Sequence, residues 1–210
     1  MPTGKRFWED KYDSVGVSCV ARVGSSLEES QRLAGSWALM VEPILHIAAK
    51  AFPWDQSKVL DFGCGYGRWY KHLSRLFGTY SGVDICDAPI SFALDNLYLR
   101  QNDRIYRINP ESCPFVAGCF TAIWCCTVLQ HLSDEEVASN LKCFFYAVRP
   151  QGYVVLLENT TDALSKEHVA FRSRNWYFEE MRKVGLVPSE FSILVPEGRE
   201  VHTCMCAKKP

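Results

Sequence analysis

Short apolar runs alternate with stretches of helical periodicity along most of the chain. Apolar runs that end at turn residues predict buried strands, whereas apolar positions three or four residues apart predict amphipathic helices. The sequence therefore predicts strands at 57–62, 80–85, 104–108, 120–126 and 153–157, and helices at 66–77, 89–99, 133–148 and 175–183. The last two predicted strands, 191–195 and 201–207, flank Pro196-Glu197-Gly198 and indicate a hairpin.

Strands that alternate with helices predict an α/β fold with a mostly parallel, doubly wound sheet and an antiparallel strand at one edge. The length of 210 residues and the 48% hydrophobic content fit one domain, and neither a repeat nor a linker divides the chain. We expect residues 57–207 to form the core of this single domain, 1–210. Residues 1–50 would then form a helical lid or cap.

Charge and hydropathy narrow the class of protein. Lys and Arg number 23 against 24 Asp and Glu, so no global field attracts nucleic acid. The longest apolar stretch, 120–129, is about half of the roughly 20 residues that a membrane-spanning helix needs. The start of the chain lacks the apolar run of a signal peptide. We therefore expect a cytoplasmic protein that is not embedded in a membrane.

Most of the ten cysteines lie inside apolar runs, which indicates buried small side chains with reduced thiols. Reduced thiols agree with a cytoplasmic location. His202, Cys204 and Cys206 share one face of a predicted strand and could offer a metal three ligands. Because no C-x-x-C pair accompanies them, we predict no metal site.

The turn after the first predicted strand reads VLDFGCGYGR over residues 59–68. In a sheet of this type, ligands bind at the carboxyl ends of the strands. Gly63 and Gly65 allow a sharp turn and close approach of a ligand, and Gly67 allows the next helix to pack on the strand. The spacing G-x-G-x-G is neither a dinucleotide fingerprint nor a P-loop.

The polar residues around this turn indicate the chemistry of the ligand. Asp61 would repel a pyrophosphate but suits an ammonium group. Asp84, at the end of the second strand, can accept hydrogen bonds from both hydroxyls of a ribose, and Arg68 can bind a carboxylate. Ammonium, carboxylate and ribose together describe S-adenosylmethionine. The alternatives are a helix cap for Asp84 and a solvated helix residue for Arg68.

The turn, followed by GVDI, FTAIWCCTVLQHL and VRPQGYVVLLE, resembles the successive motifs of class I S-adenosylmethionine-dependent methyltransferases over residues 57–158. The resemblance implies a Rossmann-like sheet of seven strands with an antiparallel last strand, and S-adenosylmethionine as cofactor. The family often has an acid where this chain has Asn109. The amide oxygen of Asn109 can still accept a hydrogen bond from the adenine amino group. The alternative is that Asn109 is a turn residue before a proline. The predicted cofactor-binding residues are Asp61, Gly63, Cys64, Gly65, Gly67, Arg68, Asp84, Ile85, Asn109, Cys126 and Thr127.

A sulfonium already carries its leaving group, so methyl transfer mainly requires alignment of the reactants and loss of one proton. Catalytic candidates at the ends of the fourth and fifth strands are His131, Glu158 and Asn159. His131 could accept the proton or anchor the next helix. Glu158 could bind an amine or act as base, or bond to a loop. Asn159 could orient the nucleophile or belong to a turn.

Two further segments are candidates for the acceptor pocket. Near the amino terminus, Phe7, Trp8 and Tyr12 resemble the aromatic opening of many small-molecule methyltransferases, in which the segment lies over cofactor and substrate. The segment after the fifth strand contributes aromatic and basic residues. An alternative for both is packing on the core. The predicted acceptor-binding residues are Trp8, Tyr12, Arg172, Trp176 and Tyr177.

Three functions are consistent with these features. The first is methylation of an N or O atom of a small molecule, favoured because no added substrate domain is evident. The second is a protein methyltransferase for amino-terminal amines, which IWCCTVLQHLSDEE and LLENT resemble, although Phe171-Arg172-Ser173 replaces that family's acids. The third is a noncatalytic partner subunit, against which the intact glycines argue. Nucleic acid is an unlikely acceptor without an N-P-P-Y motif, and the oligomeric state stays open.

Overall fold

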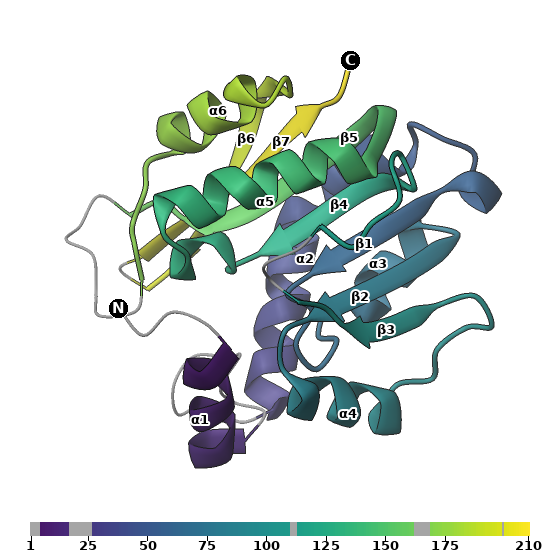
Figure 1. The fold of residues 1–210 in the computed structure, drawn as a ribbon, viewed down its shortest axis with the longest axis vertical. Helices are drawn as coiled ribbons and strands as arrows, with labels where there is room; N and C mark the ends of the chain where they lie inside the picture. Colours follow the sequence, from purple (N-terminus) through teal and green to yellow (C-terminus); the bar gives the residue numbers. More distant parts are fainter. Residues whose placement is uncertain (1–4, 17–26, 110–112, 162–168, 199) are drawn as a thin grey trace.

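The computed structural model describes residues 5–16, 27–109, 113–161, 169–198 and 200–210. Its centre is one sheet with the strand order β3-β2-β1-β4-β5-β7-β6 (Figure 1). The strands are β1 Lys58–Phe62, β2 Thr79–Asp84, β3 Arg104–Arg107, β4 Phe120–Cys126, β5 Val148–Asn159, β6 Val187–Glu197 and β7 Glu200–Lys208. The helices are α1 Lys5–Val15, α2 Leu27–Ala49, α3 Tyr70–Leu76, α4 Asp87–Asn96, α5 Asp134–Ala147 and α6 Arg174–Lys183, with short 3-10 turns at Trp54–Gln56 (η2) and Leu129–His131 (η3).

The sheet is parallel from β3 to β5, and β7 runs antiparallel to both β5 and β6. The predicted α/β class, the seven strands and the antiparallel hairpin strand are therefore confirmed. The strand order changes direction between β1 and β4, so the carboxyl ends of these neighbouring strands form the ligand-binding edge expected for such a sheet.

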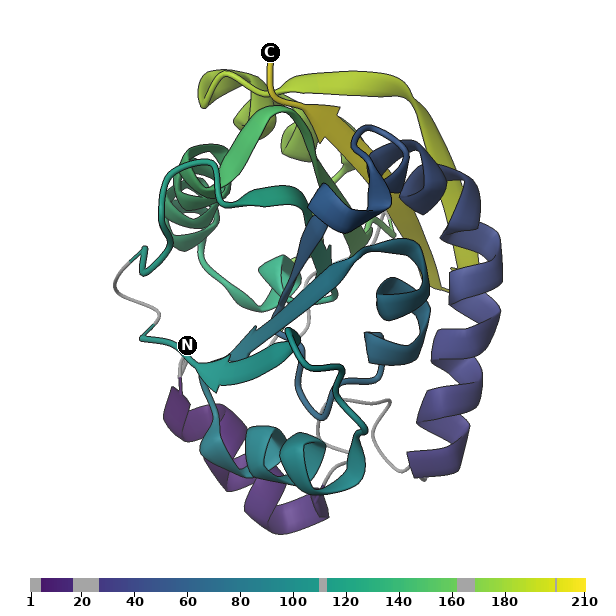
Figure 2. The same ribbon diagram turned by 90° about the vertical axis from the view of Figure 1, so that its right-hand side faces the viewer.

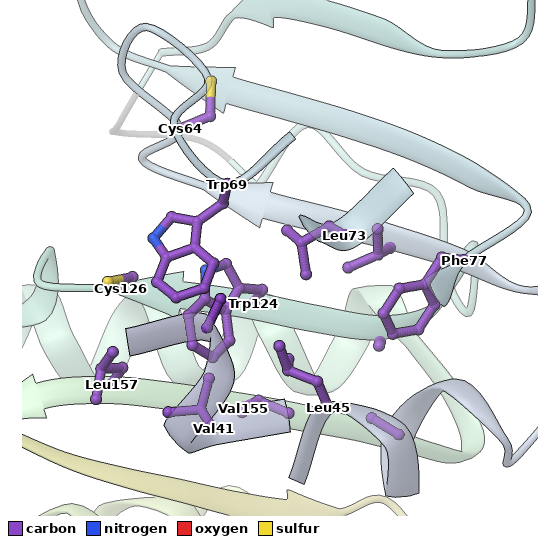
Figure 3. Packing of buried hydrophobic residues seen from close by; sticks show 14 of the residues in the cluster. Val41, Leu45, Cys64, Trp69, Leu73, Phe77, Trp124, Cys126, Val155 and Leu157 are labelled. Carbon is purple, nitrogen blue, oxygen red and sulfur yellow. The ribbon is translucent and has the colours of Figure 1, made fainter. Parts of the chain in front are cut away.

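Helices cover both faces of the sheet, as the view in Figure 2 shows. Buried residues of α2, α3 and α4 pack on one face, and those of α5 and α6 pack on the other. On the first face, Trp69 meets Trp124 of β4 with ring centroids 4.6 Å apart, and Val41 and Leu45 of α2 lie below them (Figure 3). Much of the segment predicted to be a lid thus belongs to the core, because α2 buries one apolar side against the sheet.

Several predicted boundaries differ from the structure. The strand predicted at 191–195 spans Val187–Glu197, and the helix predicted to reach residue 99 ends at Asn96. The helix predicted from residue 66 begins only at Tyr70, because Gly67 has a φ of +80° and residues 65–69 form turns. The predicted turn at residues 149–152 is part of β5, which starts at Val148. Within β5 these residues are irregular: the register against β4 shifts beside them, and Gln151 has a φ of +66°.

The expectation that the thiols are reduced is wrong for one pair of cysteines. Cys113, in the loop after β3, forms a disulfide with Cys143 of α5, and their Cα atoms are 5.4 Å apart. Unlike the strand cysteines, both lie outside apolar strands. The other described cysteines form no disulfide and are mostly buried, and Cys19 lies outside the described residues. No described helix is long and apolar enough to span a membrane.

We expect a Cys113→Ser variant to lose about 3 kcal/mol of unfolding free energy under oxidising conditions, because the disulfide closes a loop over a sequence separation of 30. Denaturant titration with and without dithiothreitol measures this. A Cys119→Ser variant, at a free cysteine, is the control: it keeps the disulfide and should lose stability in the reductant as wild type does, whereas Cys113→Ser should not respond to it. Equal stability of wild type in both conditions would show that the two cysteines are unpaired.

Candidate functional site

The glycine turn lies at the carboxyl end of β1 and is fixed to its neighbours on both sides. The backbone N–H groups of Gly63 and Cys64 both donate to the carbonyl oxygen of Val83, at 2.8 and 2.9 Å. Gly63 has a φ of +73°, and a Cβ on it would lie 2.3 Å from Val128 Cγ2. A side chain at this position would displace Val128, so the glycine lets the turn pack closely against the segment after β4.

Asp84 joins the turn to the end of β2. Its Oδ2 accepts the N–H of Gly65 at 2.9 Å, and its Oδ1 accepts the N–H of Cys86 at 3.0 Å. Burial raises the pKa of this half-buried carboxyl, and the backbone N–H donors oppose that rise. An ionised carboxylate has about four acceptor positions, so these backbone bonds leave capacity to accept a hydrogen bond from a ribose hydroxyl. The bond to the N–H of Cys86 also stabilises the start of α4. This contact is similar to the helix cap that the sequence allowed as the alternative role of Asp84.

Asp61 lies inside the protein beside the same turn. Its side chain is 1% exposed, and its Oδ2 accepts the hydroxyl of Tyr80 at 2.7 Å. Burial raises the pKa of Asp61 to about 7, against the lowering effects of the Tyr80 hydrogen bond and the Arg68 charge. A buried acid of this kind favours a positively charged partner over a phosphate.

Arg68 connects the turn to the end of β4. One guanidinium nitrogen donates to Thr127 Oγ1 at 2.9 Å and lies 3.6 Å from Cys126 Sγ. The guanidinium also lies over the ring of Trp37, 5.9 Å from its centroid. Among the described residues no carboxylate forms an ion pair with Arg68. Its charge therefore suits the carboxylate of a ligand.

The remaining predicted cofactor residues lie at the same edge of the sheet. Cys64 is buried inside the glycine turn, and half-buried Ile85 follows Asp84 directly. Asn109 is exposed just beyond β3, where the N–H of Ile108 donates to the carbonyl of Asp84. The structure thus brings the predicted cofactor residues to one edge. Their chemistry and the glycine turn fit a nucleoside that carries an amino acid.

Glu158 does not face this edge as a free carboxylate. It is fully buried, and its Oε1 accepts the N–H groups of Val128 and Leu129 at 3.1 and 3.0 Å, while its Oε2 accepts that of Gln130 at 3.1 Å. Burial raises the pKa of Glu158 to about 7. The carboxylate holds the start of η3, which corresponds to the alternative role of bonding to a loop.

Arg172 binds the carbonyl groups of the η3 turn, whose N–H groups bind Glu158. Its guanidinium donates to the carbonyl oxygens of Leu129 and Leu132, at 3.0 and 2.6 Å, and to Asp134 Oδ1 at 2.8 Å. Three of its five N–H groups, one on each nitrogen, are engaged within the protein, and the side chain is only 6% exposed, so Arg172 is built into the fold and is not presented to an acceptor. We define the η3 clamp as Glu158, Arg172 and the segment 128–132 between them.

The two predicted acceptor aromatics near Arg172 differ in their surroundings. Trp176 is partly buried, with its ring 4.8 Å from the Arg172 guanidinium. Tyr177, on the inner side of α6, is fully buried in the core that α5 and α6 form with the sheet, and its hydroxyl lacks a hydrogen bond among the described residues. The prediction that Arg172 and Tyr177 line the acceptor pocket is therefore corrected: the first belongs to the η3 clamp and the second to the core.

His131 is the one catalytic candidate that meets the amino-terminal segment. The rings of Trp8 in α1 and His131 in η3 are perpendicular, with centroids 4.8 Å apart. Gln130 Nε2 lies 3.3 Å from His131 Nε2, and Gln130 Oε1 accepts the N–H of Asn159 at 3.0 Å. The structure therefore places α1 over the end of β4, with Tyr12 half-buried on the same helix.

The side chain of Asn159 is engaged with neighbouring protein groups. Its Nδ2 donates to Glu200 Oε2 at 2.8 Å, and its Oδ1 accepts the N–H of Thr161 at 2.9 Å. These bonds connect the end of β5 to the start of β7, and they engage the buried side chain of Asn159 within the protein and not with a nucleophile. The sequence interpretation missed Gln130 and Tyr80. Gln130 lies directly beside His131, and Tyr80 lies two residues before Gly82. No other feature of the sequence marks these two residues.

Comparisons with known proteins agree with this geometry. Residues 32–193 match the family of methyltransferase domains. A ubiquinone biosynthesis O-methyltransferase of Pseudomonas fluorescens is 30% identical over 99 residues, which are 46% of this chain and 42% of that enzyme. The corresponding Acinetobacter baylyi enzyme is 32% identical over 100 residues, 46% of this chain and 41% of its own length. The chain thus spans less than half of these relatives.

Solved structures share the fold at low identity. A geranyl diphosphate methyltransferase in complex with GPP and sinefungin has a TM-score of 0.71 at 16% identity, over 98% of this chain and 97% of that one. The geranyl diphosphate C-methyltransferase of Streptomyces coelicolor, in complex with S-adenosyl-L-homocysteine, has a TM-score of 0.70 at 16% identity, over 91% and 86%.

Fold and site together define a Rossmann-like protein of the nucleoside-binding class. The chain belongs to the methyltransferase domain family, within the class I S-adenosylmethionine-dependent methyltransferases. The cofactor of this family is S-adenosylmethionine, and the glycine turn, Asp61 and Asp84 are the groups of this chain that fit it.

Proposed function

We propose that this protein transfers a methyl group from S-adenosylmethionine to an N or O atom of a small molecule. The observation that carries the proposal is the arrangement of Asp61, the glycine turn and Asp84 at one sheet edge, with His131 and Trp8 beside it. O-methyltransferases among the relatives support a small acceptor. Arg172, which lies where amino-terminal methyltransferases have acids, is engaged in the η3 clamp and gives no support to a protein acceptor.

The bound cofactor supplies an activated methyl group on a sulfonium, which leaves the protein to position the reactants and manage one proton. Asp61 would bind the ammonium group, Arg68 the carboxylate and Asp84 the ribose. Helix α1 would limit access of water above His131. The imidazole of His131 would accept the proton of the acceptor as the new bond forms.

The decisive experiment incubates the purified protein with methyl-tritiated S-adenosylmethionine and a cell extract divided by size. We expect label in the fraction of small metabolites. Label in protein would favour the amino-terminal methyltransferase instead. Binding without transfer to any fraction would identify a noncatalytic subunit and overturn the proposal.

A His131→Ala variant should lose at least about 100-fold in turnover if the imidazole is the proton acceptor, while its affinity for S-adenosylhomocysteine stays unchanged. Steady-state kinetics with the identified acceptor and calorimetry measure the two quantities. The matched control is His46→Ala, on the outer side of α2, which should leave both unchanged. Full activity in His131→Ala would remove the imidazole from the mechanism.

A cytoplasmic location is part of the same proposal. Disulfides are rare in reducing compartments, so the Cys113–Cys143 bond weighs against it. Mass spectrometry of protein from cells that are alkylated before lysis decides the point. Free Cys113 in such material would support the cytoplasm, and a quantitative disulfide would contradict it.

A further inference from the structure

Tyr80 supplies the one hydrogen bond that reaches the Asp61 carboxylate from the described residues. Both side chains lie on the sheet face that α2 and α3 cover, and Tyr80 is fully buried. Asp61 of β1 pairs with Gly82 of β2, two residues beyond Tyr80. The tyrosine must therefore lean along its strand to reach the carboxylate.

Gly82 provides the space for this contact. A Cβ on Gly82 would lie 2.8 Å from the Tyr80 hydroxyl oxygen and 3.0 Å from Cys64 Sγ. Any side chain at this position would push the hydroxyl away from Asp61. The sequence Tyr80-Ser81-Gly82 therefore encodes the hydrogen bond: the first residue supplies the donor, and the third leaves room for it.

The charges around Asp61 make this bond matter. Titratable groups reach it from three elements: Tyr80 and Asp84 on β2, Cys64 and Arg68 in and after the glycine turn, and Cys125 and Cys126 on β4. Burial and Asp84 favour the neutral acid, whereas Tyr80 and Arg68 favour the carboxylate. Burial also raises the pKa of Tyr80 well above its ordinary value, so its hydroxyl keeps the proton that it donates.

We propose that Tyr80 is a positioning residue that keeps Asp61 ionised and oriented toward the ammonium group of the cofactor. A protonated Asp61 cannot form an ion pair with an ammonium group, so removal of the donor weakens binding of the amino acid part of the ligand. This inference rests on the proposed function, since it concerns the same cofactor site.

The test compares wild type with Tyr80→Phe by calorimetry between pH 5.5 and 7.5. The ligands are S-adenosylhomocysteine and 5′-methylthioadenosine, which keeps the nucleoside but lacks the amino acid. Wild-type affinity for S-adenosylhomocysteine should rise with pH, because Asp61, whose pKa is about 7, loses its proton in this range. In Tyr80→Phe the same rise in affinity should occur at a pH about one unit higher, because Asp61 loses a hydrogen bond that stabilises its charged form. Affinity for S-adenosylhomocysteine at pH 7 should therefore fall about fivefold.

Affinity for 5′-methylthioadenosine should not change in the variant. Asp61→Asn should lose the pH dependence of S-adenosylhomocysteine binding, and Tyr80→Phe should have no further effect in that background. Gly82→Ala should reproduce Tyr80→Phe by displacing the hydroxyl. The matched control is Tyr70→Phe. The Tyr70 hydroxyl donates to Asp103 instead of Asp61, and the ring centroids of Tyr70 and Tyr80 are 5.0 Å apart. It should leave the ratio of the two affinities unchanged.

The possible outcomes separate this inference from the proposed function. If wild type fails to bind S-adenosylhomocysteine, the cofactor site itself is wrong. If wild type binds it but Tyr80→Phe keeps the same affinity and pH dependence, the role of Tyr80 is refuted. An equal loss for both ligands would also refute it, because Tyr80 would then support the shape of the pocket and not the charge of Asp61.

Discussion

An Asp84→Ala variant is expected to lose at least about 100-fold in affinity for S-adenosylhomocysteine while it stays folded. In the proposed complex the carboxylate accepts a hydrogen bond from a ribose hydroxyl, and a hydrogen bond to a charged group contributes about 1.5–3 kcal/mol. The side chain also holds the glycine turn through the N–H of Gly65 and the start of α4 through the N–H of Cys86. Its removal therefore affects both the ligand contact and the shape of the turn.

Calorimetry measures the affinity, and circular dichroism checks the fold. Asp87→Ala is the matched control, since this aspartate lies three residues further along with a side chain that is 61% exposed. It should bind the ligand as wild type does. An affinity in Asp84→Ala that matches wild type would show that the ribose lies elsewhere, and the cofactor site would have to be placed again.

The cofactor side of the site could be predicted because short stretches of sequence determine it. The spacing of Gly63, Gly65 and Gly67 fixes the backbone of the turn, and the end of each parallel strand fixes the edge at which its next residue lies. Asp84 thus reaches Gly65 across 19 positions of sequence through strand pairing alone. The alternation of strands and helices gave the order of the layers in the same way.

The acceptor side could not be predicted to the same extent. Glu158 and Arg172 are residue types that often act on substrates, and nothing local shows that they bind an irregular segment, 128–132, by its N–H and carbonyl groups. The disulfide between Cys113 and Cys143 likewise depends on how a loop packs against α5. Tyr80 looks like an ordinary apolar strand residue until its partner on β1 is known.

Replacement of Arg172 by alanine is expected to destabilise the protein by about 3–5 kcal/mol, in the range for loss of one partner of a buried charged network. The carbonyl oxygens of Leu129 and Leu132 would lose their donor, and the buried Glu158 would lose its nearby positive charge. For a domain of this size, about 3 kcal/mol corresponds to a decrease of roughly 6–12 °C in Tm. Arg174→Ala, at an exposed position two residues away, should change Tm little.

The effect of Arg172→Ala should depend on pH in a defined direction. Burial raises the pKa of Glu158 to about 7, and the Arg172 charge opposes this rise. An acid with a raised pKa in the folded state costs stability as pH increases toward that pKa, because the unfolded chain releases its proton more readily. Without Arg172 this cost continues to grow above pH 7. The difference in unfolding free energy between wild type and variant should thus be larger at pH 8.5 than at pH 5.5.

The same variant separates the η3 clamp from the role of Arg172 that the sequence suggested. If the guanidinium bound the acceptor, Arg172→Ala would keep the stability of wild type and raise KM alone. If it holds η3, stability falls first, and turnover falls with it at temperatures where the variant is still folded, because His131 lies at the end of the released turn. Thermal unfolding and acceptor kinetics on one preparation therefore decide between the two, and a change in KM without a change in Tm would contradict the clamp.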